Sequence, residues 1–172
     1  MAEARRQFVL RIAGAAGVAP AVLGVLGGTG PVLARGDETD LGILSAAVTL
    51  EHHAIFLYGV GLKRGLFPSG LRAYAVEFRG DHQGHRDTQV AIIEERGGRA
   101  PEARSDYDVG PLSPGDAFVR EALRVEIAAK EAYAALISHI DTRDYLLSAA
   151  FILVDEVRHM TVWRRVLGLK IY

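Results

Sequence analysis

Six side chains with metal-binding chemistry stand at helical spacing along this sequence. Three are glutamates and three are histidines, namely Glu51, His82, His85, Glu126, Glu156 and His159. The Glu-x-x-His step from Glu156 to His159 places an oxygen and a nitrogen ligand on one face of a helix, and His82 and His85 repeat the same spacing. Because the chain contains no cysteine, oxygen and imidazole ligands alone must hold any metal ion. The residue types therefore predict a metal site.

Each of these side chains interrupts an apolar seam with three- and four-residue spacing. The first seam runs through Leu44, Val48, Glu51, Ile55, Tyr58 and Leu62, and the fourth through Ala149, Ile152, Glu156, His159, Trp163 and Val166. The second seam ends in Gln89 and Ile92, and the third ends in Tyr133 and Ile137. A buried carboxylate is unfavourable unless it finds a partner. Since the interruptions lie at similar distances from their helix starts, an antiparallel bundle would bring them to one level.

The two halves of the sequence repeat each other. Glu51-x-x-Ala54-x-x-x-Tyr58 in the first half matches Glu126-x-x-Ala129-x-x-x-Tyr133 in the second half. The first glutamate precedes His85 by 34 residues, and the second precedes His159 by 33 residues. A repeated hairpin with equivalent ligands favours one pseudo-symmetric metal site.

Other interpretations of these residues stay open at this point. Glu126 would lie on a solvated face with Glu121 and Lys130 if the third seam were shifted by one position. The two tyrosines of the repeat could pack in the core or relay an electron. We interpret three further histidines as surface groups or as groups behind the ligands: His52, His53 and His139. We expect three aspartates to pair with arginines or to orient a ligand imidazole: Asp81, Asp87 and Asp155.

Four helical segments must position these side chains, and no stretch alternates as a strand would. Glycine and proline clusters divide the chain into segments of similar length, 40–64, 69–97, 114–138 and 143–167. The expected helix starts are Thr39 or Asp40, Ser69, and an N-cap at Ser113 followed by Pro114 at the first helical position. Short links make two antiparallel hairpins, and the long middle connection can cross the length of the bundle. The sequence therefore predicts an all-α, ferritin-like four-helix bundle.

The sequence resembles the ferritin-like superfamily, in particular its exported bacterial ferritin-like domain proteins, over about residues 38–168. The resemblance rests on Leu50-Glu51-His52-His53-Ala54, Asp81-His82-Gln83-Gly84-His85-Arg86-Asp87, the Glu126 repeat and Glu156-Val157-Arg158-His159. The di-iron members carry a glutamate on helices one and three and Glu-x-x-His on helices two and four. The resemblance implies that Glu51, Glu126, Glu156, His159 and His85 match this pattern, with one or two iron ions as cofactor.

The second helix departs from the family pattern, because His82 stands where the di-iron members have a glutamate. The predicted site then holds three carboxylates and three imidazoles. A richer imidazole set favours zinc, copper, nickel or a single iron ion over an iron pair, and manganese is a further candidate.

The N-terminus is typical of an export signal. Arg5-Arg6-Gln7-Phe8-Val9 resembles the twin-arginine signal, and the uncharged run 12–34 ends in the small-residue pattern Val32-Leu33-Ala34. We predict a signal peptide over 1–34, a ferritin-like domain over 35–172 and a periplasmic or otherwise exported protein. The alternative is an uncleaved membrane anchor, since the uncharged run is long enough to span a bilayer.

Composition narrows the partners and functions. With 20 basic and 21 acidic residues the net charge is −1, so we expect no nucleic acid partner. We expect the twin-arginine export machinery as a partner, allow for a homo-oligomer, and expect membrane contact only through the signal segment. Three functions remain: a metal-dependent oxidase or ferroxidase-type oxidoreductase, a metal storage or buffering protein, and a non-catalytic envelope protein.

Overall fold

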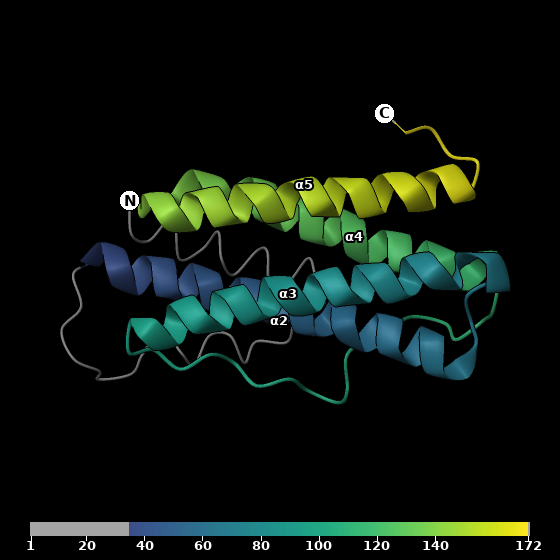
Figure 1. Ribbon diagram of the computed structural model, residues 1–172, viewed down its shortest axis with the longest axis horizontal. Coiled ribbons are helices and arrows are strands. Elements are labelled where there is room, and N and C mark those ends of the chain that lie inside the picture. The colour runs from purple at the N-terminus through teal and green to yellow at the C-terminus, as the bar shows by residue number, and fades with distance from the viewer. Residues whose placement is uncertain (1–34, 172) are drawn as a thin grey trace.

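Four long helices form the described part of the protein, with no strand among them (Figure 1). The computed structural model describes residues 35–171, with side chains from Asp40 onward, so the predicted signal segment lies outside the described residues. The four helices are α2 (Arg35–Arg64), α3 (Arg72–Glu95), α4 (Asp116–Leu136) and α5 (Arg143–Val166). The short 3₁₀ helices η2 (Ser69–Leu71) and η3 (Ile137–His139) precede α3 and follow α4. The predicted four-helix bundle is confirmed.

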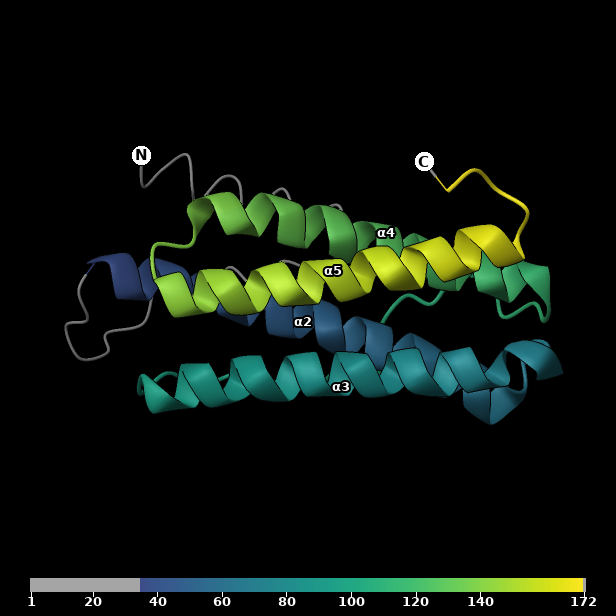
Figure 2. The ribbon, with the colours of Figure 1, turned by 45° about the horizontal axis from the view of Figure 1, so that its top comes forward.

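The helices pair as two antiparallel hairpins, α2 with α3 and α4 with α5 (Figures 1 and 2). The connection 96–115 runs back along α2 from the end of α3 to the start of α4 (Figure 1). This crossover allows both hairpins to present the same face to the bundle interior, as the ferritin-like arrangement requires.

Three of the expected helix starts are wrong. α2 begins at Arg35, so Asp40 lies inside the helix, where its buried carboxylate accepts the backbone N–H groups of Asp141 at 3.0 Å and Thr142 at 2.9 Å. Asp40 therefore caps the chain entering α5 instead of its own helix. Ser69 begins η2, and the α-helix itself starts at Arg72.

The third correction concerns the start of α4, which begins at Asp116 behind Gly115 and not at Pro114 behind Ser113. Gly115 has a positive φ of 76°, a conformation that glycine adopts readily. Its N–H group donates to the carbonyl of Leu66 at 2.8 Å, which joins the start of α4 to the connection between α2 and α3. The chain turns at Gly115 as it leaves the crossover, and this turn uses the positive φ of the glycine. The helix therefore begins after Gly115 and not at Pro114.

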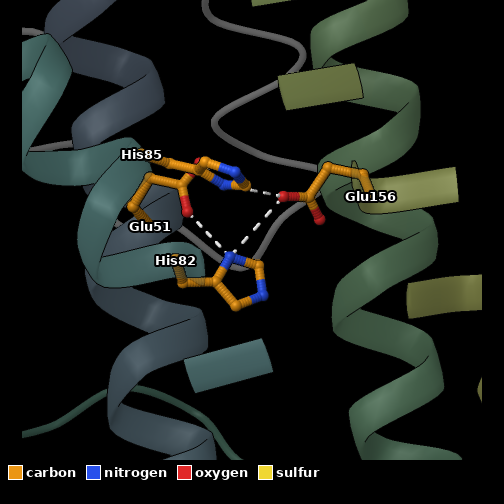
Figure 3. Close-up of side chains that lie close together, drawn as sticks. All are labelled: Glu51, His82, His85 and Glu156. Carbon is orange, nitrogen blue, oxygen red and sulfur yellow. Dashed lines mark hydrogen bonds and ion pairs between the residues drawn. The ribbon is translucent and has the colours of Figure 1, made fainter. Parts of the chain in front are cut away.

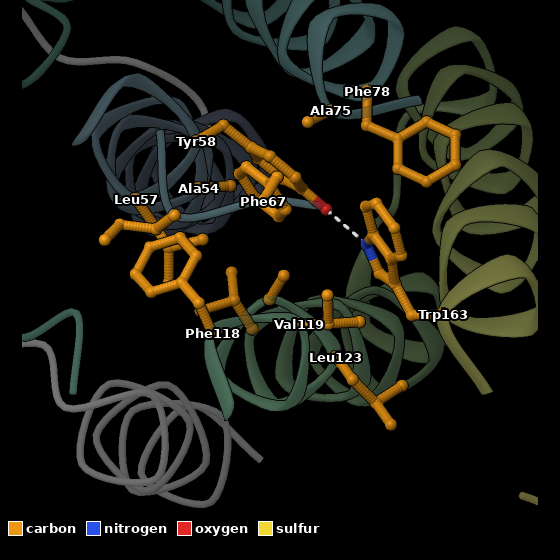
Figure 4. Close-up of a cluster of buried hydrophobic side chains, with 13 residues drawn as sticks. Ala54, Leu57, Tyr58, Phe67, Ala75, Phe78, Phe118, Val119, Leu123 and Trp163 are labelled. Carbon is orange, nitrogen blue, oxygen red and sulfur yellow. Dashed lines mark hydrogen bonds between the residues drawn. The ribbon is translucent and has the colours of Figure 1, made fainter. Parts of the chain in front are cut away.

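Apolar side chains fill the two ends of the bundle and leave the middle polar. The first cluster surrounds Val48, Ile93 and Leu136, and the second surrounds Phe78, Phe118 and Trp163 (Figure 4). The predicted seams are buried or half-buried along their length. At two seam ends the inward position is taken by the neighbouring residue, Ile93 instead of Ile92 and Leu136 instead of Ile137.

Among the described residues, one helix is long and apolar enough to cross a membrane by length and composition. It is α2 over Asp40–Arg64, and 78% of its most apolar 18-residue window is buried against the rest of the protein. That burial is typical of the core helix of a bundle.

Candidate metal centre

All six predicted ligands meet in the middle of the bundle, between the two apolar clusters. Every helix contributes: α2 brings Glu51, α4 brings Glu126, and α3 and α5 bring two residues each. They form two groups in which one ligand atom per residue lies within 4.8 Å of the others, Glu51–His82–His85–Glu156 and His82–Glu126–Glu156–His159. Figure 3 shows the first group. All six residues are buried, so the alternative that places Glu126 on a solvated face is wrong.

His82 and Glu156 belong to both groups and occupy the centre of the site. The Nδ1 atom of His82 lies 2.8 Å from Glu51 Oε2 and 3.5 Å from Glu156 Oε1 (Figure 3). Its other ring nitrogen, Nε2, lies 3.4 Å from Glu126 Oε1. The imidazole thus presents one nitrogen to each ligand group.

Several ligand atoms in the site are buried without a hydrogen-bond partner. They are His85 Nδ1, Glu126 Oε2, both carboxylate oxygens of Glu156, and His159 Nδ1. Buried polar atoms are almost always satisfied, because each unsatisfied one costs about 1–3 kcal/mol. These atoms belong to the two ligand groups, and all are of types that bind metals. The residues present therefore fit a bound metal ion.

Two aspartates hold the outer edges of two ligand imidazoles. Asp155 Oδ2 lies 3.3 Å from His85 Nε2, and Asp81 Oδ2 lies 3.0 Å from His159 Nε2. A carboxylate on Nε2 keeps the proton there and leaves Nδ1, the inner nitrogen, free to bind an ion. The predicted contacts of these aspartates with imidazole are confirmed. Asp87, the third predicted aspartate, instead pairs with Arg86.

The two tyrosines of the sequence repeat donate to the two non-shared glutamates. Tyr58 donates to Glu126 Oε1, and Tyr133 donates to Glu51 Oε1. Each phenol oxygen in turn accepts a hydrogen bond, at 2.7 Å from Trp163 Nε1 and at 2.5 Å from Gln89 Nε2. Both tyrosines are therefore core residues, as one of the two interpretations predicted, and both also contact candidate ligands. The electron-relay role stays a prediction.

Opposite charges offset the cost of burial in this layer. Burial opposes ionisation of Glu51, but its hydrogen bond with His82 and its ion pair with His85, whose Nδ1 lies 3.8 Å from Glu51 Oε1, outweigh that cost and lower its pKa to about 2. Burial likewise opposes protonation of His85, yet the carboxylates of Glu156, at 3.4 Å from its Nδ1, and of Glu51 raise its pKa to about 10. The pKa of Glu126 is lowered and that of His82 is raised for the corresponding reasons.

Glu156 differs from the other two carboxylates. Burial raises its pKa well above the ordinary value, and the nearby charges of Glu126 and Glu51 add to that rise. Its Oε1 atom also faces both imidazoles, at 3.5 Å from His82 Nδ1 and 3.4 Å from His85 Nδ1, so these three groups hold their protons jointly. A divalent ion would replace these protons, so metal binding would be coupled to proton release.

The remaining histidines have other roles. His52 and His53 are buried and not on the surface: their Nε2 atoms lie 3.1 Å from Pro101 O and 2.6 Å from Asp108 O. His53 also stacks on Tyr107. They hold the crossover against α2, a role that sequence spacing could not reveal because their partners are about fifty residues away. His139 lies in η3 and belongs to neither ligand group.

A family model described as ferritin-like domain matches residues 39–169, which is most of the chain. The chain belongs to the ferritin-like family. This ferritin-like chain is also similar to a solved structure, the conserved hypothetical protein rv2844 from Mycobacterium tuberculosis, at 29% sequence identity and a TM-score of 0.70. The similarity covers 75% of this chain and 90% of that chain. A comparison with curated proteins gave no match.

Within this ferritin-like chain, buried histidine and glutamate groups are placed to hold a metal ion. The departure noted in the sequence lies at the centre of the site, because His82 is one of the two residues shared by both ligand groups.

Proposed function

We propose that this ferritin-like protein binds one or two first-row divalent metal ions at mid-bundle, iron foremost, and acts as a metal-dependent oxidase or ferroxidase-type oxidoreductase. The observation that carries the proposal is the set of buried ligand atoms without hydrogen-bond partners, contributed by His85, Glu126, Glu156 and His159. These atoms lie at ion-pair distance from one another, at 3.4 Å between His85 Nδ1 and Glu156 Oε1 and at 3.4 Å between His159 Nδ1 and Glu126 Oε2. An ion bound between them would give each atom a ligand bond in place of an unmade hydrogen bond.

The side chains would have two roles: some would bind the ion, and others would hold the ligands in position. Glu51, Glu126 and Glu156 would offset the ion's positive charge, and three imidazoles would complete the ligand set. When bound, iron supplies one-electron redox chemistry toward dioxygen or peroxide. Tyr58 and Tyr133 each donate a hydrogen bond to a candidate ligand carboxylate, so each would fix the position of that carboxylate.

His82 sets the limits on which metal is bound. With three carboxylates, the site carries less negative charge than the four-carboxylate pattern of the di-iron members. A second iron ion is therefore neutralised less well, and zinc, copper, nickel or manganese compete more effectively.

The test begins with protein purified from its native host. We expect elemental analysis to find iron, or another first-row metal, at close to one or two ions per chain. Anaerobic titration with Fe²⁺ followed by exposure to air should then consume oxygen. A double variant, His85→Ala with Glu156→Ala, is the control and should bind and consume far less.

Three other results would separate the competing functions. Protein that neither carries nor takes up metal would contradict the proposal. Bound iron without oxygen consumption, held inside a large shell of subunits, would favour storage. If the wild-type protein is metal-free and the double variant is as stable as the wild type, the result would favour the third function, a non-catalytic envelope protein.

We also propose that the chain is exported by the twin-arginine route. The support is the Arg5-Arg6-Gln7-Phe8-Val9 pattern and the uncharged run that follows it. Fractionation of host cells and N-terminal sequencing should find the chain outside the cytoplasm, beginning after Ala34. An Arg5→Lys, Arg6→Lys double variant should remain in the cytoplasm, whereas Arg11→Lys should still be exported.

A further inference from the structure

The candidate metal centre is closed on most sides. The two apolar clusters cover it at both ends of the bundle, and the closely packed hairpins α2–α3 and α4–α5 cover two sides. The crossover lies over the side between α2 and α4, where Asp108 contacts His53 and Gly110 lies against Glu121. Within the described residues, 35–171, the side between α3 and α5 is therefore the one left for an ion that reaches the ligands without unfolding the bundle.

The seam between α3 and α5 is built differently from the others. These helices run alongside each other (Figure 2), but their backbones make fewer close contacts than those of the hairpin pairs. Half-exposed charged side chains fill the seam. His85 lies nearest to solvent, with 11% of its side chain exposed, against at most 1% for the other five candidate ligands.

Arg158 connects the charged side chains across this seam. Its Nη1 atom donates to Glu77 Oε1 at 2.7 Å, and its Nη2 atom donates to Asp81 Oδ2 at 2.5 Å. Its Nε atom lies 3.4 Å from Asp155 Oδ1. We call this set the Arg158 bridge, which consists of Arg158, Glu77, Asp81 and Asp155.

The Arg158 bridge touches the metal centre at two points. Asp81 contacts His159 and Asp155 contacts His85. The Nδ1 atom of each imidazole faces inward, at 3.4 Å from Glu126 for His159 and at 3.4 Å from Glu156 for His85. Behind them lies the Glu156 carboxylate, which is fully buried and has no hydrogen-bond partner for either oxygen. A continuous line of metal-ligating groups therefore runs from the solvent-facing bridge to the buried ligands.

We propose that a divalent cation reaches the metal centre through the α3–α5 seam, and that Arg158 closes this route. The inference rests on the proposed metal-binding function. The three carboxylates of the bridge attract a hydrated cation, but the guanidinium occupies all three. Uptake and release both require Arg158 to swing away, after which a cation at Asp81 or Asp155 is one side chain from a ligand imidazole.

The test measures Co²⁺ uptake by stopped-flow absorbance and its release to an excess of chelator. In Arg158→Ala we expect both rates to rise at least about tenfold, which corresponds to about 1.4 kcal/mol of barrier, with little change in the dissociation constant. Arg158→Lys keeps the charge, but an ammonium group cannot hold all three carboxylates, so both rates should rise there too. Far-UV circular dichroism and thermal unfolding establish that each variant is folded.

A matched control is available on α4. Arg124 is as exposed as Arg158 and pairs with Glu121, away from the α3–α5 seam. Arg124→Ala removes the same charge and should exchange Co²⁺ at wild-type rates.

Other outcomes would overturn the inference. Unchanged rates in both Arg158 variants would show that the seam is not the route, while leaving metal binding intact. Faster uptake with slower release in Arg158→Ala, and wild-type rates in Arg158→Lys, would show that charge alone matters. If the wild-type chain binds no Co²⁺ at equilibrium, the proposed function itself fails.

Discussion

The two hairpins of this bundle place equivalent residues at equivalent positions around one centre. Glu51 of the first hairpin corresponds to Glu126 of the second, and each accepts a hydrogen bond from the tyrosine of the opposite hairpin. His85 corresponds to His159, and each is contacted on its outer nitrogen by an aspartate of the other hairpin. Neither hairpin can complete a ligand group alone, so the site exists only when both are packed together.

The hairpins differ at two equivalent positions, and each difference changes the chemistry. His82 of the first hairpin corresponds to Glu156 of the second, which makes the two shared ligands unlike. Gln89 of the first hairpin corresponds to Trp163 of the second. Gln89 donates a hydrogen bond to Tyr133, and Trp163 donates one to Tyr58. The repeat therefore supplies the positions, and these substitutions make the two ligand groups chemically distinct.

The largest expected effect comes from removing a shared ligand. Glu156→Ala takes a ligand from both groups and should abolish stoichiometric metal binding. His85→Ala takes a ligand only from the first group and should leave the second group able to bind. Metal content after dialysis distinguishes them. Equal losses in both variants would mean that a single ion uses all six residues.

The next largest effect is expected from the two aspartates that contact the outer nitrogens of His85 and His159. Asp81→Asn and Asp155→Asn should each weaken metal affinity by about 10–100-fold, because an imidazole loses the carboxylate that fixes its tautomer. Competition with a chelator measures both affinities. Asp87→Asn is the control, since Asp87 pairs with Arg86 on the surface. A loss in only one of the two aspartate variants would show that one half of the site dominates.

A substitution at His82 that makes the two hairpins alike should change which metal is bound more than how tightly a metal is bound. His82→Glu gives the second helix the Glu-x-x-His pattern of the fourth helix and a fourth carboxylate. We expect iron to compete better against zinc, because added carboxylate favours harder ions. Metal content after loading from an equimolar mixture is the measurement. His82→Gln, which adds no charge, should not shift the preference toward iron.

The smallest effect is the pH dependence of the protein kept metal-free by chelator. The lowered pKa of Glu51, about 2, contributes stability that is present above the ordinary value of 4.5 and is lost as pH falls through about 2. The raised pKa of His85, about 10, contributes stability that is present below 6.5 and is lost as pH rises through about 10. The melting temperature should therefore be highest between pH 4.5 and 6.5. In Glu51→Gln the melting temperature should fall less than in the wild-type chain as the pH is lowered below 4.5.

Local spacing predicted the bundle, the crossover and the convergence of the six side chains, because helical periodicity places seam residues on one face. It did not predict Asp40, whose backbone partners Asp141 and Thr142 lie at the other end of the sequence. The same limit applies to His52 and to Arg158, because each acts on a residue distant in sequence. Contacts of this kind depend on how the hairpins pack, and no residue type or interval marks them in advance.

The apolar clusters at the two ends of the bundle have a consequence for how such a protein can change. Since the ends supply most of the apolar burial, the middle layer can lose or exchange a ligand while the helices remain packed. Selection can therefore alter metal preference one side chain at a time without first rebuilding the fold. The two shared positions illustrate this tolerance, because the same layer accommodates an imidazole at His82 and a carboxylate at Glu156.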